Sequence, residues 1–411
     1  MKRLVASLLG AVVILSLAAC GGGGGGPTKL TYYVFPEPSG SFAEAAKRCS
    51  QQSNGRYTIS IQNLPSDADS QRQNMVRRLA AKDSSIDMVG MDVIWTAEFA
   101  EAGWIRQWTG QDKAEVTKGT LAGPLQTATY QGKLYGAPAN TNTQLLWYRK
   151  DLVRTPPKTW DQMISMATKM PKAGRIEVQG RQYEGLTVWF NSLLQSAGGS
   201  VLKGTNQVSL GPPAERAAEI MRRLATSSAA DPSLSAQQED QNRLAFEQGT
   251  AAFEVNYPFV YPSAKENAPQ IFKNMGYAPW PRVDAGKAPK VSIGGLNIGV
   301  SAYSKHPAEA FAAAACMRDP AAEKVAAIKG GLPPTLSAVY DDPAVKKSYP
   351  FGNLIKQQVA DPGIRPQSPA YSDISLAIQK TLSPPSSIDP GTVVPALTDQ
   401  IKNALSSGAL L

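Results

Sequence analysis

Strand-like and helix-like segments alternate near the start of the chain, and this order restricts the possible folds more than any other feature. The strand-like segments, rich in aliphatic and aromatic residues, are residues 28–35, 57–64 and 86–90. The helix-like segments, with apolar residues at helical spacing, are residues 41–52, 70–82 and 96–102. Ser41 and Glu44 have the spacing of a capping box. Strands that each precede a helix predict a parallel, doubly wound α/β sheet.

A second informative stretch, residues 135–149, begins with small polar residues and becomes an apolar, aromatic strand. A hairpin edge at residues 131–137 precedes it, and another α/β pattern follows it. We interpret the stretch as the first crossing between two lobes. Asn140 and Asn142 alternate along an extended segment, so both side chains point to one side, toward a cleft.

The length of the chain also indicates two lobes, because 411 residues exceed what one hydrophobic core usually supports. A later strand-like segment, residues 290–301, would return the chain to the first lobe. We expect lobe 1 at residues 28–141 and 289–338, and lobe 2 at residues 142–288 and 339–411.

The N-terminal segment has the features of an export signal. Two basic residues precede an apolar stretch at residues 4–17, which is too short for a transmembrane helix, so we expect a signal peptide at residues 1–19. The sequence Leu-Ala-Ala-Cys that ends at Cys20 resembles the bacterial lipobox, in which the cysteine is lipidated. The alternative is an ordinary signal peptide with an incidental cysteine. With lipidation, residues 20–27 form a lipidated, Gly-rich tether, and the protein lies on the outer face of the cell membrane.

The charge of the chain is positive but not clustered. The formal net charge is +9, and the signal peptide contributes two of these charges, which leaves +7 for the mature chain. No run of interleaved basic and aromatic residues is present, so we expect no nucleic-acid binding. A surface that lies near anionic lipid explains the charge equally well.

The mature chain keeps two cysteines besides Cys20, namely Cys49 and Cys316. Both lie on helix-like stretches. In an exported protein they form either one disulfide or two separately buried thiols. We favour the disulfide, because the predicted fold brings both helices into one lobe.

The sequence gives little support for a metal site or for a catalytic nucleophile. The chain has one histidine, His306, which we interpret as a helix-cap residue. Without a His/Cys cluster, a Gly-x-Ser-x-Gly motif or phosphate-loop spacing, we expect no metal and no cofactor. Glycoside hydrolases use a pair of carboxylates, and Asp92 with Glu37 or with Glu247 would supply such a pair, so this enzyme class stays an alternative. We favour the alternative that these acids accept hydrogen bonds from sugar hydroxyls.

Residues at predicted strand ends locate the ligand crevice. In doubly wound sheets, ligands bind beyond the carboxyl ends of the strands. Glu37 follows the first strand and Asp92 follows the third. Tyr257 follows a predicted strand at residues 251–256, where its ring face can pack against the apolar face of a sugar.

Several motifs resemble those of bacterial extracellular solute-binding proteins of sugar ABC importers. They are the lipobox, residues 86–92, 99–104 and 146–152, Pro138, Gly198-Gly199, and Phe246 with Gly249 and Ala252. Within this family the chain is similar to the trehalose-binding lipoproteins of actinobacteria. That similarity is carried by residues 92–104, 141–149, 293–297, 330–333 and 364–366.

The resemblance implies a periplasmic-binding-protein-like fold, with two doubly wound α/β lobes joined by hinge crossings and a disaccharide between them. It implies a monomer that is not an enzyme and that delivers sugar to an ABC permease. Asp92 and Asn142 would bond glucose hydroxyls from the two sides, and Arg365 would donate a forked pair of hydrogen bonds. Gly295 would let the backbone approach the sugar. Further ligand candidates are Glu37, Asn140, Glu247 and Tyr257.

Two departures from the resemblance concern the ligand. Tyr257 stands where we expect a tryptophan, which keeps the stacking but with a smaller face and an added hydroxyl. The stretch between Tyr257 and Met275 is also shorter than expected. Trehalose is therefore the first candidate, and other α-linked glucose disaccharides of the maltose type are the alternative.

Overall fold

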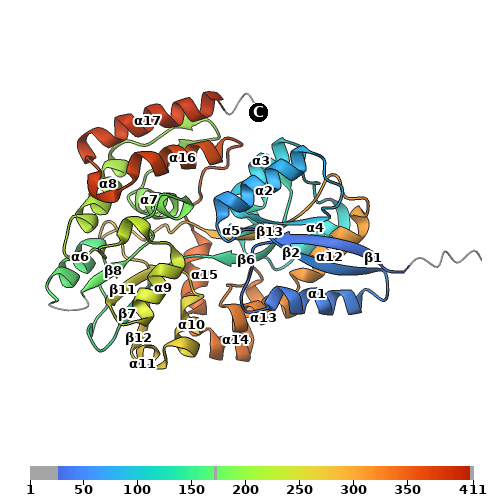
Figure 1. Cartoon of the computed structure of the whole chain (residues 1–411), viewed down its shortest axis with the longest axis horizontal. Coiled ribbons are helices and arrows are strands. Elements are labelled where there is room, and N and C mark those ends of the chain that lie inside the picture. Colours follow the sequence, from blue (N-terminus) through green and yellow to red (C-terminus); the bar gives the residue numbers. More distant parts are fainter. Residues whose placement is uncertain (1–25, 171–173, 408–411) are drawn as a thin grey trace, which may run out of the picture.

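The computed structural model describes residues 26–170 and 174–407, so Cys20 and the predicted signal peptide lie outside the described residues. Figure 1 shows two α/β lobes side by side, each built around its own sheet. This architecture agrees with the predicted fold class. Across the described ranges, none of the helices combines the length and the apolar character that a bilayer-spanning helix needs.

The first lobe contains a five-stranded sheet with the strand order β2-β1-β3-β13-β6. Its strands are β1 (Thr28–Val34), β2 (Tyr57–Asn63), β3 (Met88–Asp92), β6 (Ala137–Asn142) and β13 (Gly294–Val300). β1 pairs in parallel with β2 and β3, as the alternating pattern predicted. β13 is antiparallel to both β3 and β6, because the chain enters this strand on its return from the other lobe.

The second lobe contains a four-stranded sheet with the strand order β12-β7-β11-β8. Its strands are β7 (Leu145–Arg149), β8 (Arg175–Glu177), β11 (Ala251–Asn256) and β12 (Met275–Ala278). β7 is antiparallel to β11 and β12, whereas β8 is parallel to β11. Two small hairpins accompany the sheets, β4 (Thr129–Tyr130) with β5 (Lys133–Leu134) and β9 (Leu202–Lys203) with β10 (Gln207–Val208).

The helices cover both sheets (Figure 1). Before the first crossing they are α1 (Ser41–Gln52), α2 (Ala68–Ala80), α3 (Thr96–Glu101), α4 (Gly110–Thr117) and α5 (Ala122–Thr127). Between that crossing and β13 they are α6 (Trp160–Thr168), α7 (Glu184–Ser196), α8 (Pro212–Ala225), α9 (Glu239–Glu247), α10 (Val260–Asn267) and α11 (Pro269–Phe272). After β13 they are α12 (Pro307–Met317), α13 (Pro320–Gly330), α14 (Pro343–Ser348), α15 (Gly352–Ala360), α16 (Tyr371–Leu382) and α17 (Pro390–Ser407). Short 3-10 helices lie at Val93–Trp95 (η1), Leu234–Ala236 (η2), Ser337–Asp341 (η3) and Pro385–Ser387 (η4).

Three segments run between the lobes. The first joins β6 to β7 and the second leads into β13, so each of these two passes from one sheet to the other. The third, between α15 and α16, lies beside the second. The second and third pair with each other, because the Ile293 amide donates to the Gly363 carbonyl and the Gly363 amide donates to the Val291 carbonyl. The sheets change between Asn142 and Leu145 and again just before Gly294. The finer lobe boundaries stay a prediction.

Trp147 holds the first crossing to the second lobe. The side chain is fully buried and packs against Tyr261, Tyr277 and Phe351. Its indole nitrogen donates to the Asn256 carbonyl at 2.9 Å. Aromatic packing of this kind stabilises beyond simple area burial, so Trp147 fixes β7 to the second lobe.

Cys49 in α1 and Cys316 in α12 form a disulfide, the pairing that we favoured from the sequence. Their Cα atoms lie 5.9 Å apart, although 267 positions separate them in the chain. Beside the disulfide, both Arg48 guanidinium Nη atoms donate to the Asp319 carboxylate at 2.7 Å. The first lobe is therefore cross-linked between its N-terminal helix and a helix that follows the return crossing.

Removal of this disulfide should destabilise the protein. A Cys49→Ser/Cys316→Ser double variant should lose about 2–5 kcal/mol of unfolding free energy, because the disulfide restricts a long loop in the unfolded chain. Urea unfolding of the variant, compared with wild type with and without reductant, measures the loss. Equal midpoints for the variant and the oxidised wild type would contradict the prediction.

Candidate functional site

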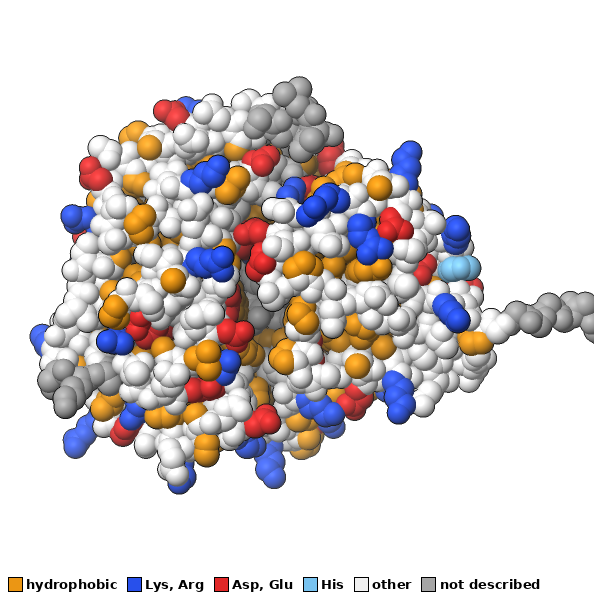
Figure 2. Space-filling model, in the orientation of Figure 1, with side chains coloured by type: hydrophobic (Ala, Val, Ile, Leu, Met, Phe, Trp, Pro, Cys, Tyr) orange, Lys and Arg blue, Asp and Glu red, His pale blue; other side chains and the backbone are white. Residues whose placement is uncertain are grey.

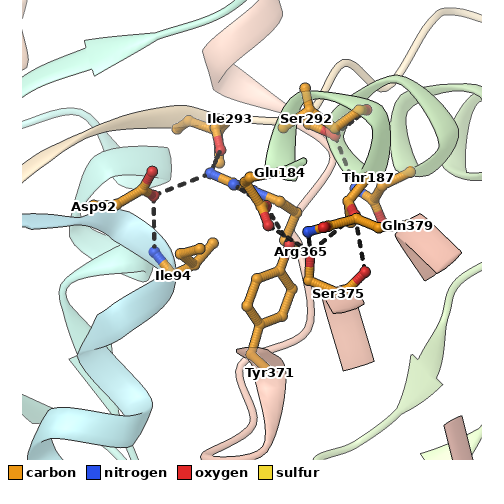
Figure 3. A network of polar contacts seen from close by, with 12 residues as sticks. Asp92, Ile94, Glu184, Thr187, Ser292, Ile293, Arg365, Tyr371, Ser375 and Gln379 are labelled. Carbon is orange, nitrogen blue, oxygen red and sulfur yellow. Dashed lines mark hydrogen bonds and ion pairs between the residues drawn. The ribbon is translucent and has the colours of Figure 1, made fainter. Parts of the chain in front are cut away.

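Arg365 lies in the segment between α15 and α16, and its side chain connects the two lobes. The residue is only 6% exposed. Its Nη1 donates to Glu184 Oε1 at 2.6 Å, and its Nη2 donates to Asp92 Oδ1 and to the Ile293 carbonyl, both at 3.3 Å (Figure 3). Asp92 belongs to the first lobe and Glu184 to the second. One planar guanidinium therefore binds a carboxylate of each lobe, as a forked donor can.

Glu184 is the buried partner that holds Arg365. It is the first residue of α7, a helix that is buried along nearly its whole length. Besides Arg365, the Glu184 carboxylate accepts hydrogen bonds from the Tyr371 hydroxyl at 2.6 Å and from Ser375 Oγ at 2.5 Å. Burial raises the pKa of Glu184, and Arg365 and these two hydroxyls lower it only in part. The sequence analysis missed Glu184, although an acid that opens an otherwise apolar helix was a detectable signal.

Asp92 is the last residue of β3, where the strand pattern predicted it. Its Oδ1 accepts a hydrogen bond from the Ile94 amide at 3.2 Å as well as the one from Arg365 (Figure 3). Its other oxygen, Oδ2, accepts no hydrogen bond from the described residues. That oxygen therefore has acceptor capacity for a ligand.

Asn142 ends β6 and lies opposite Gly294 in the sheet. Gly294 follows Ile293, whose carbonyl accepts a hydrogen bond from Arg365. Asn142 therefore lies close to Arg365. Its Oδ1 accepts from the Thr143 amide at 3.1 Å. In the described part of the chain, the Asn142 Nδ2 group has no acceptor, so it has donors for a ligand.

Asn140, which is buried, and Gly295, which is partly buried, both act on the backbone of the first sheet. Asn140 Nδ2 donates to the Thr141 carbonyl at 3.1 Å, and its Oδ1 has no partner among the described residues. Gly295 has a φ of +128°, and an added Cβ would lie 2.3 Å from the Asn140 carbonyl oxygen. We expected Gly295 to admit a sugar; the structure instead gives a requirement for glycine in the pairing of β13 with β6.

Tyr257 follows β11, and its backbone amide donates to Asn256 Oδ1 at 2.8 Å. Burial raises the pKa of the Tyr257 hydroxyl; Glu239 and Asp92 raise it further, and Arg365 lowers it. These charges act on the hydroxyl only because they lie near it, so Tyr257 belongs to the same group as Asp92 and Arg365. Glu239, the first residue of α9, also joins this group and was missed from the sequence.

The carboxylates of Glu37 and Glu247 both accept hydrogen bonds from neighbouring residues. The Glu37 carboxylate accepts from the Ser39 amide at 2.8 Å and from the Ser41 amide and hydroxyl at 2.9 and 2.7 Å. It therefore accepts hydrogen bonds from the first residue of α1, whose cap residue is Gly40 rather than the expected Ser41.

His306 does occupy the N-cap position of α12, but its side chain makes no capping hydrogen bond.

Glu247 lies at the opposite end of α9 from Glu239. Roughly 12 Å of helix separates the two positions. The Glu247 carboxylate binds Arg243 at 2.8 Å and accepts from Ser263 Oγ at 2.6 Å, which ties α9 to α10. Both Glu247 carboxylate oxygens therefore have partners within the second lobe, and a ligand role for Glu247 stays a prediction.

A buried polar network on β8 and β11 contacts the backbone of Tyr257 through Asn256. Glu254 and Glu177 are register partners on β11 and β8, and both are fully buried. Asn256 Nδ2 donates to Glu254 Oε1 at 2.7 Å and to the Glu239 carbonyl at 2.9 Å. Burial raises the pKa of Glu254 to about 8, with a smaller contribution from Glu177, and burial raises the pKa of Glu177 to about 7.

The same network reaches the first crossing. Gln144 Nε2 donates to Gln179 Oε1 at 2.6 Å, and Gln179 Nε2 donates to Asn242 Oδ1 at 2.9 Å. Asn242 in turn donates to Glu177 Oε2 at 3.4 Å. A continuous set of buried side chains therefore runs from the hinge strand to the strand that presents Tyr257.

The surface is hollowed between the lobes, and acidic side chains gather there (Figure 2). A small cavity of about 20 Å³ adjoins Arg365. Its lining residues are Val93, Ile94, Thr96, Ala97, Thr127, Ile293, Ile364, Arg365, Pro366 and Gln367. These walls are mostly apolar and include none of the other predicted ligand residues. In the described ranges, no three His, Cys, Asp or Glu side chains gather as a metal site would require.

Comparison with known proteins gives consistent matches. The sequence profile of the family described as "Bacterial extracellular solute-binding protein" matches residues 36–324, which is more than half of the chain. The chain is 28% identical to a "Probable ABC transporter-binding protein" of Deinococcus radiodurans, over 72% of this chain and 73% of that protein.

Solved structures match over nearly the whole chain. The maltose-bound MalE3 of T. maritima superposes with a TM-score of 0.81 at 26% identity, covering 93% of this chain and 99% of that one. The GacH receptor of Streptomyces glaucescens GLA.O superposes with a TM-score of 0.80 at 21% identity, covering 92% and 99%. The latter likeness concerns the fold alone.

The Arg365–Glu184 pair should be strongly coupled. Arg365→Met leaves a buried carboxylate without its cation and should lose about 3–5 kcal/mol of unfolding free energy. Arg365→Met combined with Glu184→Gln should lose clearly less than the sum of the two single losses. Urea unfolding of all four proteins gives the coupling energy. Lys290→Met, which removes the exposed Lys290–Asp361 pair near the hinge, is the control and should change stability by less than about 1 kcal/mol. Strict additivity would contradict the coupling.

The buried Glu254 should make stability depend on pH. Its pKa lies near 8 in the folded protein, against an ordinary value of 4.5, so the folded state binds more protons in this interval. Stability should therefore be highest below about pH 4.5 with respect to this group and should fall as the pH rises through about 8. Glu254→Gln keeps the shape without the charge, so its Tm relative to wild type should increase from pH 5 to pH 9. A difference that stays the same at both pH values would contradict this assignment.

Proposed function

This chain belongs to the family of bacterial extracellular solute-binding proteins, and we propose that it captures a disaccharide between its lobes and delivers it to an ABC permease. The family comprises exported binding proteins rather than enzymes. The hydrolase alternative is therefore set aside, which agrees with the separate structural role of Glu247.

One observation carries the proposal of a polar, uncharged ligand. Asp92 and Asn142 each keep polar atoms without a hydrogen-bond partner in the described chain, and both lie beside the lobe-connecting Arg365. A sugar hydroxyl can donate to Asp92 Oδ2 and accept from Asn142 Nδ2, since a hydroxyl does both. Tyr257 adds an aromatic face from the second lobe, where the apolar face of a pyranose can pack.

For the sugar itself we propose trehalose, with other α-linked glucose disaccharides of the maltose type as the alternative. The resemblance of residues 141–149 and 364–366 to trehalose-binding lipoproteins supports the first. The maltose bound to the MalE3 neighbour supports the second. Both sugars offer two glucose rings whose hydroxyls can be contacted from opposite lobes.

Binding would favour the closed arrangement of the lobes. The ligand stabilises that state only through contacts that it makes to both lobes at once. Asn142 lies at the crossing itself, so a sugar bound to it and to Tyr257 spans the hinge. Cys20, in the lipobox, would anchor the protein to the outer face of the cell membrane, with the Gly-rich residues 21–26 as a tether.

Isothermal titration with trehalose, maltose and lactose tests the proposal. Trehalose or maltose should bind and raise the Tm, because a ligand of the native state stabilises it. Asn142→Ala should weaken binding by about 10–100-fold, the effect of losing a hydrogen bond in a closed site. Asn353→Ala, which changes an exposed residue of α15, is the matched control and should bind like wild type.

Two outcomes would contradict the proposal. Steady release of glucose from either sugar would identify an enzyme. Unchanged affinity in Asn142→Ala would remove this residue from the site.

A further inference from the structure

Four carboxylates lie at the ends of four different elements of the two lobes. Asp69 and Asp92 come from the first lobe, and Glu184 and Glu239 come from the second. Burial is the main cause of the raised pKa of Asp69, Glu184 and Glu239, and in each case the charge of Asp92 raises the pKa further. Contacts also connect three of them to the site: Arg365 binds both Asp92 and Glu184, and the Glu239 carbonyl accepts from Asn256, whose Oδ1 accepts from the Tyr257 amide.

Asp69 shows how close the lobes come. It lies in the first turn of α2, yet the backbone amide of Glu184 in the other lobe acts to lower its pKa. Asp67 raises the Asp69 pKa and Arg72 lowers it. An anion that entered between α2 and α7 would meet this acidic group directly.

Three of these acids also occupy the sites where an anion would ordinarily bind. Helix N-termini attract anions because their first amides lack partners and the helix dipole is positive there. Asp69 lies in the first turn of α2, and Glu184 and Glu239 are the first residues of α7 and α9. The favourable ends of three cleft-facing helices are thus already compensated by the protein's own carboxylates.

The arginines at the cleft are compensated as well. Arg365 binds Asp92 and Glu184, and Arg72 binds Glu98 with two hydrogen bonds of 2.7 and 2.5 Å. Arg365 Nε, on a side chain that is more than nine-tenths buried, is a donor without a partner among the described residues. The charge of this guanidinium is already compensated by two carboxylates, so its remaining N–H can donate a hydrogen bond to a sugar hydroxyl oxygen.

The acidity of the cleft is local. The mature chain has a formal net charge of +7 once the two signal-peptide charges are removed. Acidic side chains nevertheless gather in the hollow between the lobes (Figure 2). The charge of the cleft is therefore opposite to that of the molecule as a whole.

We propose that the cleft selects its ligand by charge: it admits neutral sugars and sugars that carry an amino group, and it rejects sugars that carry a phosphate or a carboxylate. An anion would exchange its water for a site that carboxylates line, and juxtaposed like charges cost several kcal/mol. A neutral hydroxyl donates to these carboxylates, and an ammonium group gains a charge-assisted hydrogen bond. This inference rests on the proposed sugar-binding function.

The test is titration calorimetry with trehalose, maltose, their 6-phosphates and 6-amino-6-deoxytrehalose. Each phosphate should bind at least about 100-fold more weakly than its neutral parent. Added salt should narrow this affinity gap, because it screens the charges of the cleft. The amino sugar should bind at least as well as trehalose. Glu239→Gln should narrow the gap by about tenfold, since it removes one charge from the cleft. Glu215→Gln removes a charge from the exposed face of α8 and should leave the gap unchanged.

The outcomes separate this inference from the proposed function. Equal binding of a neutral sugar and its phosphate, or tighter binding of the phosphate, would overturn charge selection and leave a sugar-binding protein. A gap that Glu215→Gln narrows as much as Glu239→Gln would also overturn it, because the discrimination would then come from the overall charge. If none of the five sugars binds, the proposed function fails and this inference fails with it.

Discussion

The buried guanidinium of Arg365 is the interaction on which the rest of the site depends. A cation that is taken out of water must be compensated nearby, and here the compensation comes from one carboxylate in each lobe. Glu184 can serve only because Tyr371 and Ser375 satisfy its remaining acceptor positions. The position of α7, the start of α16 and the end of β3 are therefore all constrained by one charged group at the hinge.

Around this group the chain couples the hinge to the cleft in two ways. Asn142 is both the last residue of β6 and the side chain with donors for a ligand, whereas Trp147, a few residues later, is locked into the second lobe. Beneath them, the buried network from Gln144 to Glu177 joins the crossing to the strand before Tyr257. The first crossing and the strand before Tyr257 are thus parts of one packed structure.

The electrostatics of the site follow from where helices begin. α2, α7 and α9 all begin at the cleft, and each has an acid in its first turn. This arrangement satisfies the helix ends without a bound anion and leaves hydroxyl-sized polar positions for a ligand. Burial is the main cause of the raised pKa of Asp69 and Glu239, and neighbouring acids raise it further, although the chain as a whole is basic.

Local pattern determined much of this protein. The alternating segments of residues 28–102 predicted three parallel strands, and the strand-end rule located Asp92, because both depend on side-chain spacing within a few residues. Only the tertiary structure decided that β13 enters the first sheet antiparallel, that Glu37 caps a helix, and that Glu247 lies a helix length from the cleft. Glu184 and Glu239 became site residues for the same reason: a carboxylate acquires its role from charges and donors far away in the chain, and only folding brings those groups together.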